Sequence, residues 1–551
     1  MTNLTPKALA SLCLASAEKY KDRLAFAMVK DGQISGRITY TQLGVRARQI
    51  AALLRQLGVE KGDRVLLLSE NCPEWPLTYF SIAIAGAVSV PLLTGFSGEE
   101  IQNITNHSGV SAFCLTRTMA AKLELSGFPK TPFIFIDGIT DEANGVSVSL
   151  DGVEKRMPLR LSGEDSLPVN QCGPDDLATI IYTSGTQGGS KGVMLSGTNL
   201  ISSALTSMIF QKLLPSDRFL STLPLAHSYE CGLGLLAPVI CGASVTYIDR
   251  PPSASVLKTA VKLVRPTAMF VVPLLIEKIY NNAIAPKLRN SKLYKFSVTR
   301  PLAIRVAGKK LISALGGRLR VMGIGGAPLS PVVEEFLYRA RFPYTVGYGL
   351  TETAPLVAGK YTLRYPNTEG LCAASGVSIR IAKCAADVNH DEGEIQVRGP
   401  NVMLGYYKDN ERSAEAFTPD GWLRTGDLGR LDEKGRLHIR GRLKALILGP
   451  SGENIYPEEI EGILGTSQLV EDALVYSGNR GELVAMVRLN DTAQNSAGGI
   501  ENILEELRAW VNKKLSTFSR LSRIEIRKEP FEKTPTMKIK RYLYGSLPVR
   551  Q

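Results

Sequence analysis

Apolar runs typical of β-strands alternate with longer segments of helical periodicity through most of the chain. Examples are Arg64–Leu68, Ala178–Tyr182 and Arg320–Ile324, each beside a helix-like segment. A strand that is followed by a helix and another strand favours parallel pairing, because the helix crosses back over one face of the sheet. We therefore predict an α/β fold with layered α/β subdomains and mostly parallel sheets.

The length of the chain and a change in its pattern of predicted strands and helices together predict two domains. At 551 residues the chain exceeds what one hydrophobic core usually supports. From about Glu394 onward, short strands and glycine turns replace the earlier alternation, as in Gly393–Arg398 and Gly435–Arg440. We place the boundary so that an N-terminal domain covers residues 1–441 and a smaller α+β domain covers residues 442–551.

Composition and charge limit the kinds of partner and the cellular compartment that we expect for this chain. The net charge of +13 predicts an anionic partner, which includes nucleic acid, a membrane surface or a phosphorylated small molecule. The eight cysteines form no CxxC pair, so we expect free thiols in a reducing, cytoplasmic compartment. The apolar stretch Ala8–Ala17 reads as a first helix rather than a signal, and Cys231–Ile248 is broken by Gly and Pro. Any membrane contact is therefore expected to be peripheral.

The most informative segment is the loop Tyr182–Gly192, which directly follows a predicted strand. Glycines, hydroxyl side chains and Lys191 supply N–H donors, O–H donors and a cation, which suits a polyphosphate. A Walker A loop fails here, because Ser190 precedes the lysine and Gly192 follows it. Taken alone, the segment is equally compatible with a Gly/Ser surface turn.

The pattern Tyr-Thr-Ser-Gly-Thr-x-Gly-x-x-Lys-Gly resembles the signature loop of the adenylate-forming superfamily, which includes acyl-CoA synthetases, amino-acid adenylation domains and beetle luciferases. Gln187 and Ser190 depart from the usual Thr and Pro. The resemblance implies a large N-terminal adenylation domain that binds ATP and the acyl group. It also implies contacts to the nucleotide phosphates from Thr183, Ser184, Gly185, Thr186, Gly188 and Lys191.

Further motifs follow in the order of the family. Gly325–Pro328 and Gly347–Thr353 resemble the adenine-binding segments, Gly421–Asp427 resembles the ribose motif, and Gly441–Lys444 resembles the domain hinge. The resemblance implies that Tyr348 stacks on adenine, Thr351 contacts the α-phosphate and Glu352 holds Mg²⁺. Asp427 and Arg442 would bind ribose, and Lys444 would be the hinge residue. The implied nucleotide contacts in these segments are Gly325, Gly326, Ala327, Pro328, Gly347, Tyr348, Gly349, Thr351, Asp427 and Arg442.

The C-terminal segments resemble the part of the family that moves between half-reactions. Thr534–Arg541 is similar to the catalytic-lysine motif of the long-chain fatty acyl-CoA synthetase branch, which places that lysine at Lys538. A solvated basic tail is the alternative for this segment taken alone. Ser451–Glu459 is similar to the loop of the CoA tunnel, so Gly452, Glu453 and Asn454 are implied to line it.

The segment Leu223–Glu230 indicates the kind of acid that is activated. Amino-acid-activating members of the family carry an Asp in this segment, whereas this chain has none there and becomes apolar after it. His227 is implied to gate the carbonyl site, and a packed core histidine is the alternative. The expected reaction is ATP-dependent activation of a long-chain fatty acid through an acyl-adenylate, with transfer to CoA. Mg²⁺ is the implied cofactor, and ATP and CoA are the implied co-substrates. Alternatives are a fatty acyl-AMP ligase or acyl-acyl-carrier-protein synthetase, a luciferase-like oxygenase and an inactive lipid-binding scaffold.

The basic residues are concentrated in one stretch. Between Lys278 and Val333 eleven Lys and Arg occur without an acid, interleaved with residues such as Leu293 and Phe296. A solvated helical face is one interpretation, and a patch that contacts anionic membrane, at the inner face of a membrane, is the other. No nucleic-acid module is present in the sequence, so the excess charge does not indicate nucleic acid.

Overall fold

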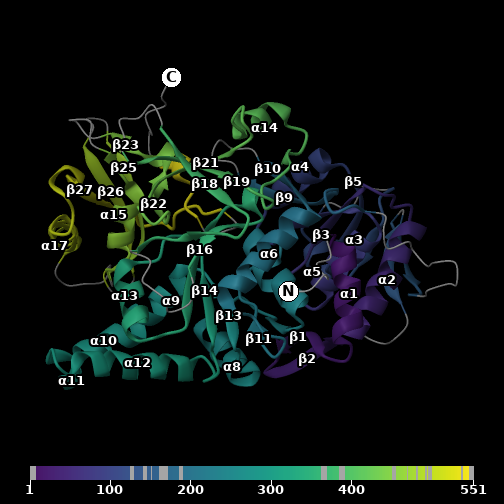
Figure 1. Ribbon diagram of the computed structural model, residues 1–551, viewed down its shortest axis with the longest axis horizontal. Helices are drawn as coiled ribbons and strands as arrows, with labels where there is room; N and C mark the ends of the chain where they lie inside the picture. The colour runs from purple at the N-terminus through teal and green to yellow at the C-terminus, as the bar shows by residue number, and fades with distance from the viewer. Residues whose placement is uncertain are drawn as a thin grey trace.

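The first of two nine-stranded sheets lies at the centre of the computed structural model and is parallel over its middle six strands (Figure 1). Its edge strands pair in the antiparallel sense. In sheet order the strands are β17 (Cys372–Ala373), β16 (Leu356–Gly359), β15 (Tyr344–Gly349), β14 (Val321–Ile324), β13 (Ala268–Val271), β11 (Arg218–Leu220), β12 (Ser244–Ile248), β1 (Leu24–Lys30) and β2 (Gln33–Thr39).

The second nine-stranded sheet has a parallel centre of β9, β4, β3, β5 and β6. Strands that pair in the antiparallel sense close both ends. Its strands, in sheet order, are β20 (Gly405–Tyr406), β10 (Ser190–Ser196), β9 (Leu177–Ser184), β4 (Val88–Leu92), β3 (Arg64–Leu68), β5 (Val110–Leu115), β6 (Phe133–Phe135), β7 (Val146–Leu150) and β8 (Val153–Met157). The predicted α/β fold with mostly parallel sheets is confirmed.

Helices connect and cover these sheets. Several start at capping boxes, in which the N-cap hydroxyl and the N3 side chain satisfy each other's backbone donors: Thr39 with Gln42, Ser97 with Glu100 and Ser196 with Asn199. The helices of this part are α1 (Leu9–Tyr20), α2 (Tyr40–Gln56), α3 (Glu74–Ile84), α4 (Gly98–Ser108), α5 (Arg117–Ala120), α6 (Gly197–Gln211), α7 (Ala237–Cys241), α8 (Ala254–Val264), α9 (Pro273–Ile279), α10 (Ala285–Arg289), α11 (Lys292–Lys295), α12 (Arg300–Ala314), α13 (Pro331–Arg339) and α14 (Asn410–Ala416).

Two π-helices interrupt the regular pattern, η2 (Glu230–Leu236) and η3 (Tyr280–Ile284). The segment Cys231–Ile248, which glycines and a proline interrupt, contains most of η2 together with α7 and β12. Its glycines permit close packing: a Cβ at Gly232 would lie 3.1 Å from Pro355 Cδ, in the segment that follows β15. A π-turn at such a position is typical of functional sites.

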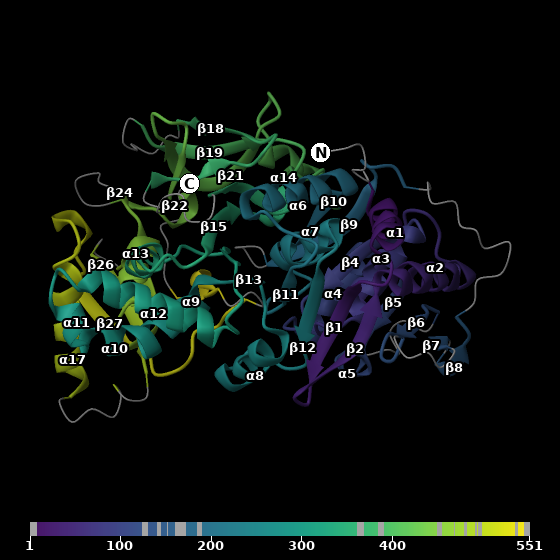
Figure 2. The same ribbon diagram turned by 60° about the horizontal axis from the view of Figure 1, so that its bottom comes forward.

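Smaller elements follow toward the C-terminus. A four-stranded antiparallel sheet contains β18 (Ser378–Ala382), β19 (Gly393–Arg398), β21 (Leu423–Leu431) and β22 (Leu437–Arg442). The remaining elements are β23 (Ile447–Leu448), β24 (Asn454–Ile455), α15 (Pro457–Leu464), β25 (Val470–Ser477), β26 (Leu483–Leu489), α17 (Ile500–Asn512), η7 (Thr517–Ser519), β27 (Arg523–Ile526) and η8 (Arg541–Leu543). In Figure 2 the strands β18, β19 and β21 lie at the top of the view, and β24, β26, β27 and α17 lie at its left end.

The hydrophobic cores follow this arrangement. One core joins α1, α2 and α3 to both nine-stranded sheets, and a second lies around β13, β14, α12 and α13. A third core is formed by residues between Ile447 and Ile524. The domain boundary at residues 441 and 442 stays a prediction, although a separate core after it is what such a boundary requires.

The structure describes residues 8–123, 130–139, 145–150, 152–159, 172–184, 190–360, 369–383, 391–448, 454–467, 469–478, 482–490, 493, 499–534 and 538–544. Within these ranges, no helix combines the length and the apolar run that crossing a bilayer requires.

Candidate active site

The predicted phosphate loop connects two paired strands. Across the β9–β10 hairpin, Lys191 lies opposite Thr183 and Gly192 lies opposite Tyr182. Gly192 is required here, because a Cβ would lie 2.9 Å from Ile180 Cγ2. Gly185, Thr186 and Gly188 lie outside the described residues, as does the side chain of Ser184. The hairpin therefore places Lys191 at the base of the loop.

Tyr406, from the distant strand β20, brings Lys191 and Glu352 together. The Lys191 ammonium lies 4.9 Å from the centre of the Tyr406 ring, and the Tyr406 hydroxyl donates a 2.9 Å hydrogen bond to Glu352 Oε1. The Glu352 backbone is fixed by Met403, whose N–H donates to its carbonyl at 2.9 Å. The ring face of Tyr406 orients the Lys191 ammonium, and the Tyr406 hydroxyl orients the Glu352 carboxylate. No motif had pointed to Tyr406.

The segment that carries Thr351 and Glu352 is a 3₁₀ turn, η4 (Thr351–Thr353), held in a narrow space. A Cβ at Gly349 would lie only 1.7 Å from the Pro355 carbonyl oxygen, so glycine is obligatory there. The Thr351 hydroxyl lies 3.3 Å from the Ser228 hydroxyl. The predicted nucleotide segment thus contacts the segment after β11 that carries His227.

Tyr348, Asp427 and Arg442 form one hydrogen-bonded group. The Tyr348 hydroxyl donates to Asp427 Oδ2 at 2.6 Å, and Arg442 Nε lies 2.9 Å from Asp427 Oδ1. Asp427 and Arg442 are directly paired between β21 and β22. Burial raises the pKa of Asp427, while the Arg442 charge and the Tyr348 hydroxyl oppose that rise. An oriented carboxylate beside an aromatic ring is suited to accept hydroxyl donors from a ribose.

His227 has a defined tautomer. Its Nδ1 accepts a 3.2 Å hydrogen bond from the Tyr229 N–H, so a neutral ring carries its proton on Nε2. Burial and, next, the Lys538 charge lower its pKa to about 4, which keeps the ring neutral at physiological pH. Nearby, a Cβ at Gly325 would lie 3.4 Å from Tyr229 Cζ, and Gly326 has a positive φ of 86°. The Gly325–Pro328 segment therefore adjoins the segment that carries His227.

Lys538 comes to this group from the far end of the chain. Thr534 brackets it, since the Lys538 N–H donates to Thr534 Oγ1 at 3.2 Å and the Thr534 N–H donates to the Lys538 carbonyl at 2.7 Å. Desolvation and then the Arg442 charge lower its pKa, and the carboxylates of Asp427, Glu458 and Glu352 oppose this effect. The Lys538 ammonium is therefore within electrostatic range of three predicted site residues and of Glu458 of α15, which the motifs did not single out.

The remaining predicted residues are described only in part. Lys444 is exposed and lies in the 3₁₀ turn η6 (Leu443–Ala445), between β22 and β23. Asn454 begins β24, where its backbone pairs with Leu448. Gly452 and Glu453 lie outside the described residues. The roles of hinge and CoA tunnel stay predictions.

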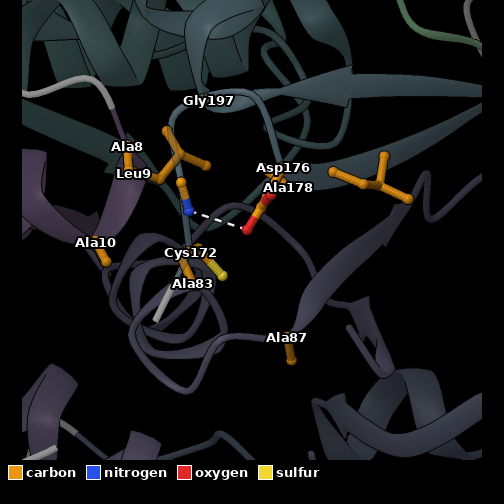
Figure 3. A pocket seen from close by; sticks show the side chains of 11 residues that line it. Ala8, Leu9, Ala10, Ala83, Ala87, Cys172, Asp176, Ala178 and Gly197 are labelled. Carbon is orange, nitrogen blue, oxygen red and sulfur yellow. Dashed lines mark hydrogen bonds between the residues drawn. The ribbon is translucent and has the colours of Figure 1, made fainter. Parts of the chain in front are cut away.

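A small cavity lies elsewhere, between α1, α3 and the segment that enters β9. It has a volume of about 10 Å³ and is lined mainly by small side chains such as Ala8, Ala83 and Ala178 (Figure 3). The Gly173 N–H donates to Asp176 Oδ2 at its edge. A space of that size holds about one water molecule, so it is not a substrate site.

Comparison with known proteins identifies the family. The model of the AMP-binding enzyme family matches residues 13–407, and that of the AMP-binding enzyme C-terminal domain matches residues 459–538. The chain belongs to the AMP-binding enzyme family. This AMP-binding enzyme is 32% identical to Long chain acyl-CoA synthetase 6, peroxisomal, of Arabidopsis thaliana, over 85% of this chain and 70% of that protein. It is 30% identical to Long-chain-fatty-acid–CoA ligase FadD15 of Mycobacterium bovis, over 92% of this chain and 90% of that protein.

Solved structures agree with the fold of this AMP-binding enzyme. The ATP-bound RpMatB-BxBclM chimera has a TM-score of 0.74 at 25% identity and covers 98% of both chains. A benzoate CoA ligase from Burkholderia xenovorans LB400 has a TM-score of 0.75 at 21% identity, over 97% of this chain and 99% of that one. The predicted membership of the adenylate-forming superfamily is confirmed.

Proposed function

We propose that this enzyme activates a long-chain fatty acid with ATP and transfers the acyl group to CoA. The observation that carries the proposal is the hydrogen-bonded group of Tyr348, Asp427 and Arg442 in the AMP-binding region. The charge of Lys538, from the C-terminal segment, lies near enough to this group to oppose the rise that burial causes in the pKa of Asp427. The identity of the acid and of the acceptor is supported by relatives that are named long-chain acyl-CoA synthetases or ligases.

In the first half-reaction, a carboxylate oxygen bonds to the α-phosphorus of ATP and the bond to the bridging oxygen breaks, which releases pyrophosphate. The two anions repel each other, so the protein must neutralise charge and align the groups. We assign charge neutralisation to Lys191 and Lys538 and a hydrogen bond from His227 Nε2–H to the acyl carboxylate. Tyr348 and Asp427 would hold adenosine, and Thr351 the α-phosphate.

Glu352 fits a magnesium ion that is bound with the nucleotide. Magnesium is commonly held by one or two carboxylates together with substrate phosphates, and no cluster of three or more candidate ligands occurs among the described residues. Glu352 is oriented by Tyr406 through one oxygen, Oε1. When bound, the ion would neutralise phosphate charge.

In the second half-reaction, the CoA sulfur bonds to the acyl carbonyl carbon and AMP leaves. We propose that residues 442–551 turn about Lys444 between the two steps, so that Gly452, Glu453 and Asn454 line the approach of the thiol. A carrier-protein thiol is the alternative acceptor, and a luciferase-like oxygenation of the acyl-adenylate is a weaker alternative. We also propose a cytoplasmic location at the inner face of a membrane, contacted through residues 278–333.

The proposal is tested by incubating the purified enzyme with ATP, Mg²⁺ and a panel of fatty acids of different chain length, with CoA or with holo-acyl carrier protein. We expect pyrophosphate, AMP and acyl-CoA in equal amounts with long-chain acids. If pyrophosphate is released and the carrier protein is acylated while CoA is not consumed, the acceptor is the carrier-protein thiol and not CoA. Absence of pyrophosphate release with every acid would refute the proposal.

A further inference from the structure

The segment from Val272 to Arg318, which contains α9, η3, α10, α11 and α12, includes helices that form an edge of the molecule (Figures 1 and 2). Large apolar side chains are exposed along this segment. Phe296 is 68% exposed and Val298 is 89% exposed, in the short connection between α11 and α12. We call this region the docking edge. Its exposed apolar residues are Val272, Leu274, Leu293, Phe296, Val298, Leu302 and Val306. Exposed apolar side chains that lie together on a protein surface mark an interaction site.

The same edge carries ten exposed cations, and no ion pair among the described residues involves any of them. They are Lys278, Lys287, Arg289, Lys292, Lys295, Arg300, Arg305, Lys309, Lys310 and Arg318. Arg320, the eleventh cation of the stretch, is turned away and pairs with Asp217. The nearest acid on α9, Glu277, accepts a 2.8 Å hydrogen bond from the Ser330 N–H. The acids of α13, which packs against α12, also pair elsewhere: Glu334 with Lys360 and Glu335 with Arg339. Ion pairs among the described residues therefore leave the charge of the ten cations unneutralised.

Cations and apolar residues alternate on one outer face of α12. Leu302 and Val306 lie one turn apart, as do Arg305 and Lys309, and all four are exposed. The packed face of α12 lies against the end of α13, because a Cβ at Gly308 would lie 2.7 Å from the Cβ of Ala340, which directly follows α13. A helix face that contacts only water gains nothing from exposing Leu302 and Val306, whereas a lipid surface contacts both apolar and cationic side chains.

The docking edge also reaches the candidate active site. Val272 directly follows β13, and its Cγ1 would lie 3.8 Å from a Cβ at Gly326. The Gly325 N–H donates to the Val271 carbonyl at 3.2 Å. The exposed apolar series thus starts beside the nucleotide-binding segment and extends along α9 to α11 and α12.

We propose that the docking edge binds an anionic phospholipid surface, with Phe296 and Val298 inserted between the headgroups and the cations on the lipid phosphates. Charge complementarity identifies the partner, since ten cations that form no ion pair with an acid among the described residues flank the apolar side chains. The proposal deepens the proposed function by assigning the membrane contact to particular side chains, and it rests on that function only for its biological purpose.

The charge component is tested by co-sedimentation of the full chain with vesicles of phosphatidylcholine and phosphatidylglycerol, and with vesicles of phosphatidylcholine alone. We expect binding to the anionic vesicles and much less to the neutral ones. The variant Arg305→Glu, Lys309→Glu, Lys310→Glu should lose binding by about fivefold or more for each reversed cation. The matched control Lys30→Glu, Arg37→Glu, Lys434→Glu makes the same charge change at exposed positions elsewhere. Equal binding by both variants would overturn the proposal.

Insertion is tested separately by a fluorescent reporter. Phe296→Trp should shift its emission to the blue on addition of anionic vesicles and be quenched by brominated lipid. Leu214→Trp, at an exposed position after α6, should show neither effect. No shift at Phe296→Trp would overturn insertion. Wild-type protein that ignores both kinds of vesicle would overturn the docking proposal and indicate an acidic protein partner.

These measurements need neither ATP nor CoA, so their outcome is independent of catalysis. The reversal variant should keep full activity on a fatty acid supplied in solution and lose activity only on acid delivered in anionic vesicles. Loss of activity on both supplies would contradict the proposed role of the edge. A wild-type enzyme that binds vesicles but activates no acid would refute the proposed function alone.

Discussion

The Ser221 hydroxyl donates a 2.5 Å hydrogen bond to Glu230 Oε1 inside the protein core. Glu230 is 1% exposed, and its second oxygen has no hydrogen-bond partner among the described residues. A Cβ at Gly234 would lie 2.4 Å from the Glu230 carboxyl carbon, so glycine makes the room for this group. Burial raises the pKa of Glu230 to about 8. The first π-helix, three residues after His227, thus begins with a carboxylic acid that is uncharged at neutral pH.

This relationship predicts a pH dependence of stability. Because the folded pKa lies above the ordinary value, folding retains a proton that the unfolded chain releases. The stabilisation is complete below about pH 4.5, decreases as pH rises and is lost through about pH 8. Glu230→Gln replaces the acid by a group that cannot ionise. We expect the free energy of unfolding of the wild type, relative to this variant, to fall by several kcal/mol between those pH values.

Denaturant unfolding of both proteins at a series of pH values measures this difference. Near-UV circular dichroism at low pH provides the control, since the variant should then match the wild type. A difference in unfolding free energy that does not change with pH would contradict the predicted pKa of Glu230.

A second buried group fixes the edge of the first sheet. The Lys360 ammonium is fully buried and donates to Glu334 Oε1 and to the Tyr344 hydroxyl, which itself donates to Glu334 at 2.9 Å. Removing one partner leaves a buried charge unpaired, so Lys360→Met should cost about 3–5 kcal/mol of unfolding free energy. Replacing Lys360 and Glu334 together by apolar residues should cost clearly less.

The matched control is the exposed pair Arg339–Glu335 on the same helix as Glu334. Arg339→Met should cost under about 1 kcal/mol, because solvent screens an exposed pair. Equal losses for Lys360→Met and Arg339→Met in denaturant unfolding would contradict the assigned role of Lys360.

Much of the fold and part of the candidate site could be predicted from the sequence. The alternation of strands and helices carries the fold, because buried parallel strands must be apolar runs. The ordered motifs gave Tyr348, Asp427 and Arg442, which the structure brings into one hydrogen-bonded group. Motif order worked because each of these residues stands in a short segment of recognisable composition: Tyr348 near the end of β15, Asp427 within β21 and Arg442 at the end of β22.

Other contributors carry no local signal. Tyr406 contacts a carboxylate 54 residues away, so only the pairing of β10 with β20 brings it there. The two π-helices could not be predicted from the sequence, because an extra residue in a helical turn leaves the pattern of apolar residues almost unchanged. Glu230 stood within the segment Leu223–Glu230, but its environment depends on contacts with Ser221 after β11 and Gly234 of the same π-helix, which form only in the folded chain.

Lys538 provides a test of the proposed division between the half-reactions. Its ammonium interacts with Asp427 and Glu352 in this conformation, so Lys538→Ala should slow acyl-adenylate formation about 10²- to 10³-fold. Thioester formation from supplied acyl-adenylate should be nearly unchanged, because the proposed second conformation does not use this side chain. Pyrophosphate exchange and single-turnover acyl transfer measure the two steps.

The control for that variant is Lys528→Ala, which removes an exposed cation of the same C-terminal stretch. It should leave both half-reactions unchanged. Equal loss of both half-reactions in Lys538→Ala would show that Lys538 supports the structure of the site and not adenylation in particular.

Tyr406 allows the magnesium assignment to be tested without altering a charged residue. Its hydroxyl holds Glu352 Oε1 at 2.9 Å while its ring lies against the Lys191 ammonium at 4.9 Å. Tyr406→Phe keeps the ring and removes only the hydroxyl, so the carboxylate loses its orientation and Lys191 keeps its contact. A hydrogen bond to a charged group contributes about 1.5–3 kcal/mol. We therefore expect the Mg²⁺ concentration for half-maximal adenylation to rise roughly tenfold or more, with little change in the KM for the fatty acid.

Tyr407→Phe, at the adjacent residue, is the matched control, since its hydroxyl contacts the Ser108 carbonyl instead. An unchanged Mg²⁺ dependence in Tyr406→Phe would mean that Glu352 does not hold the ion.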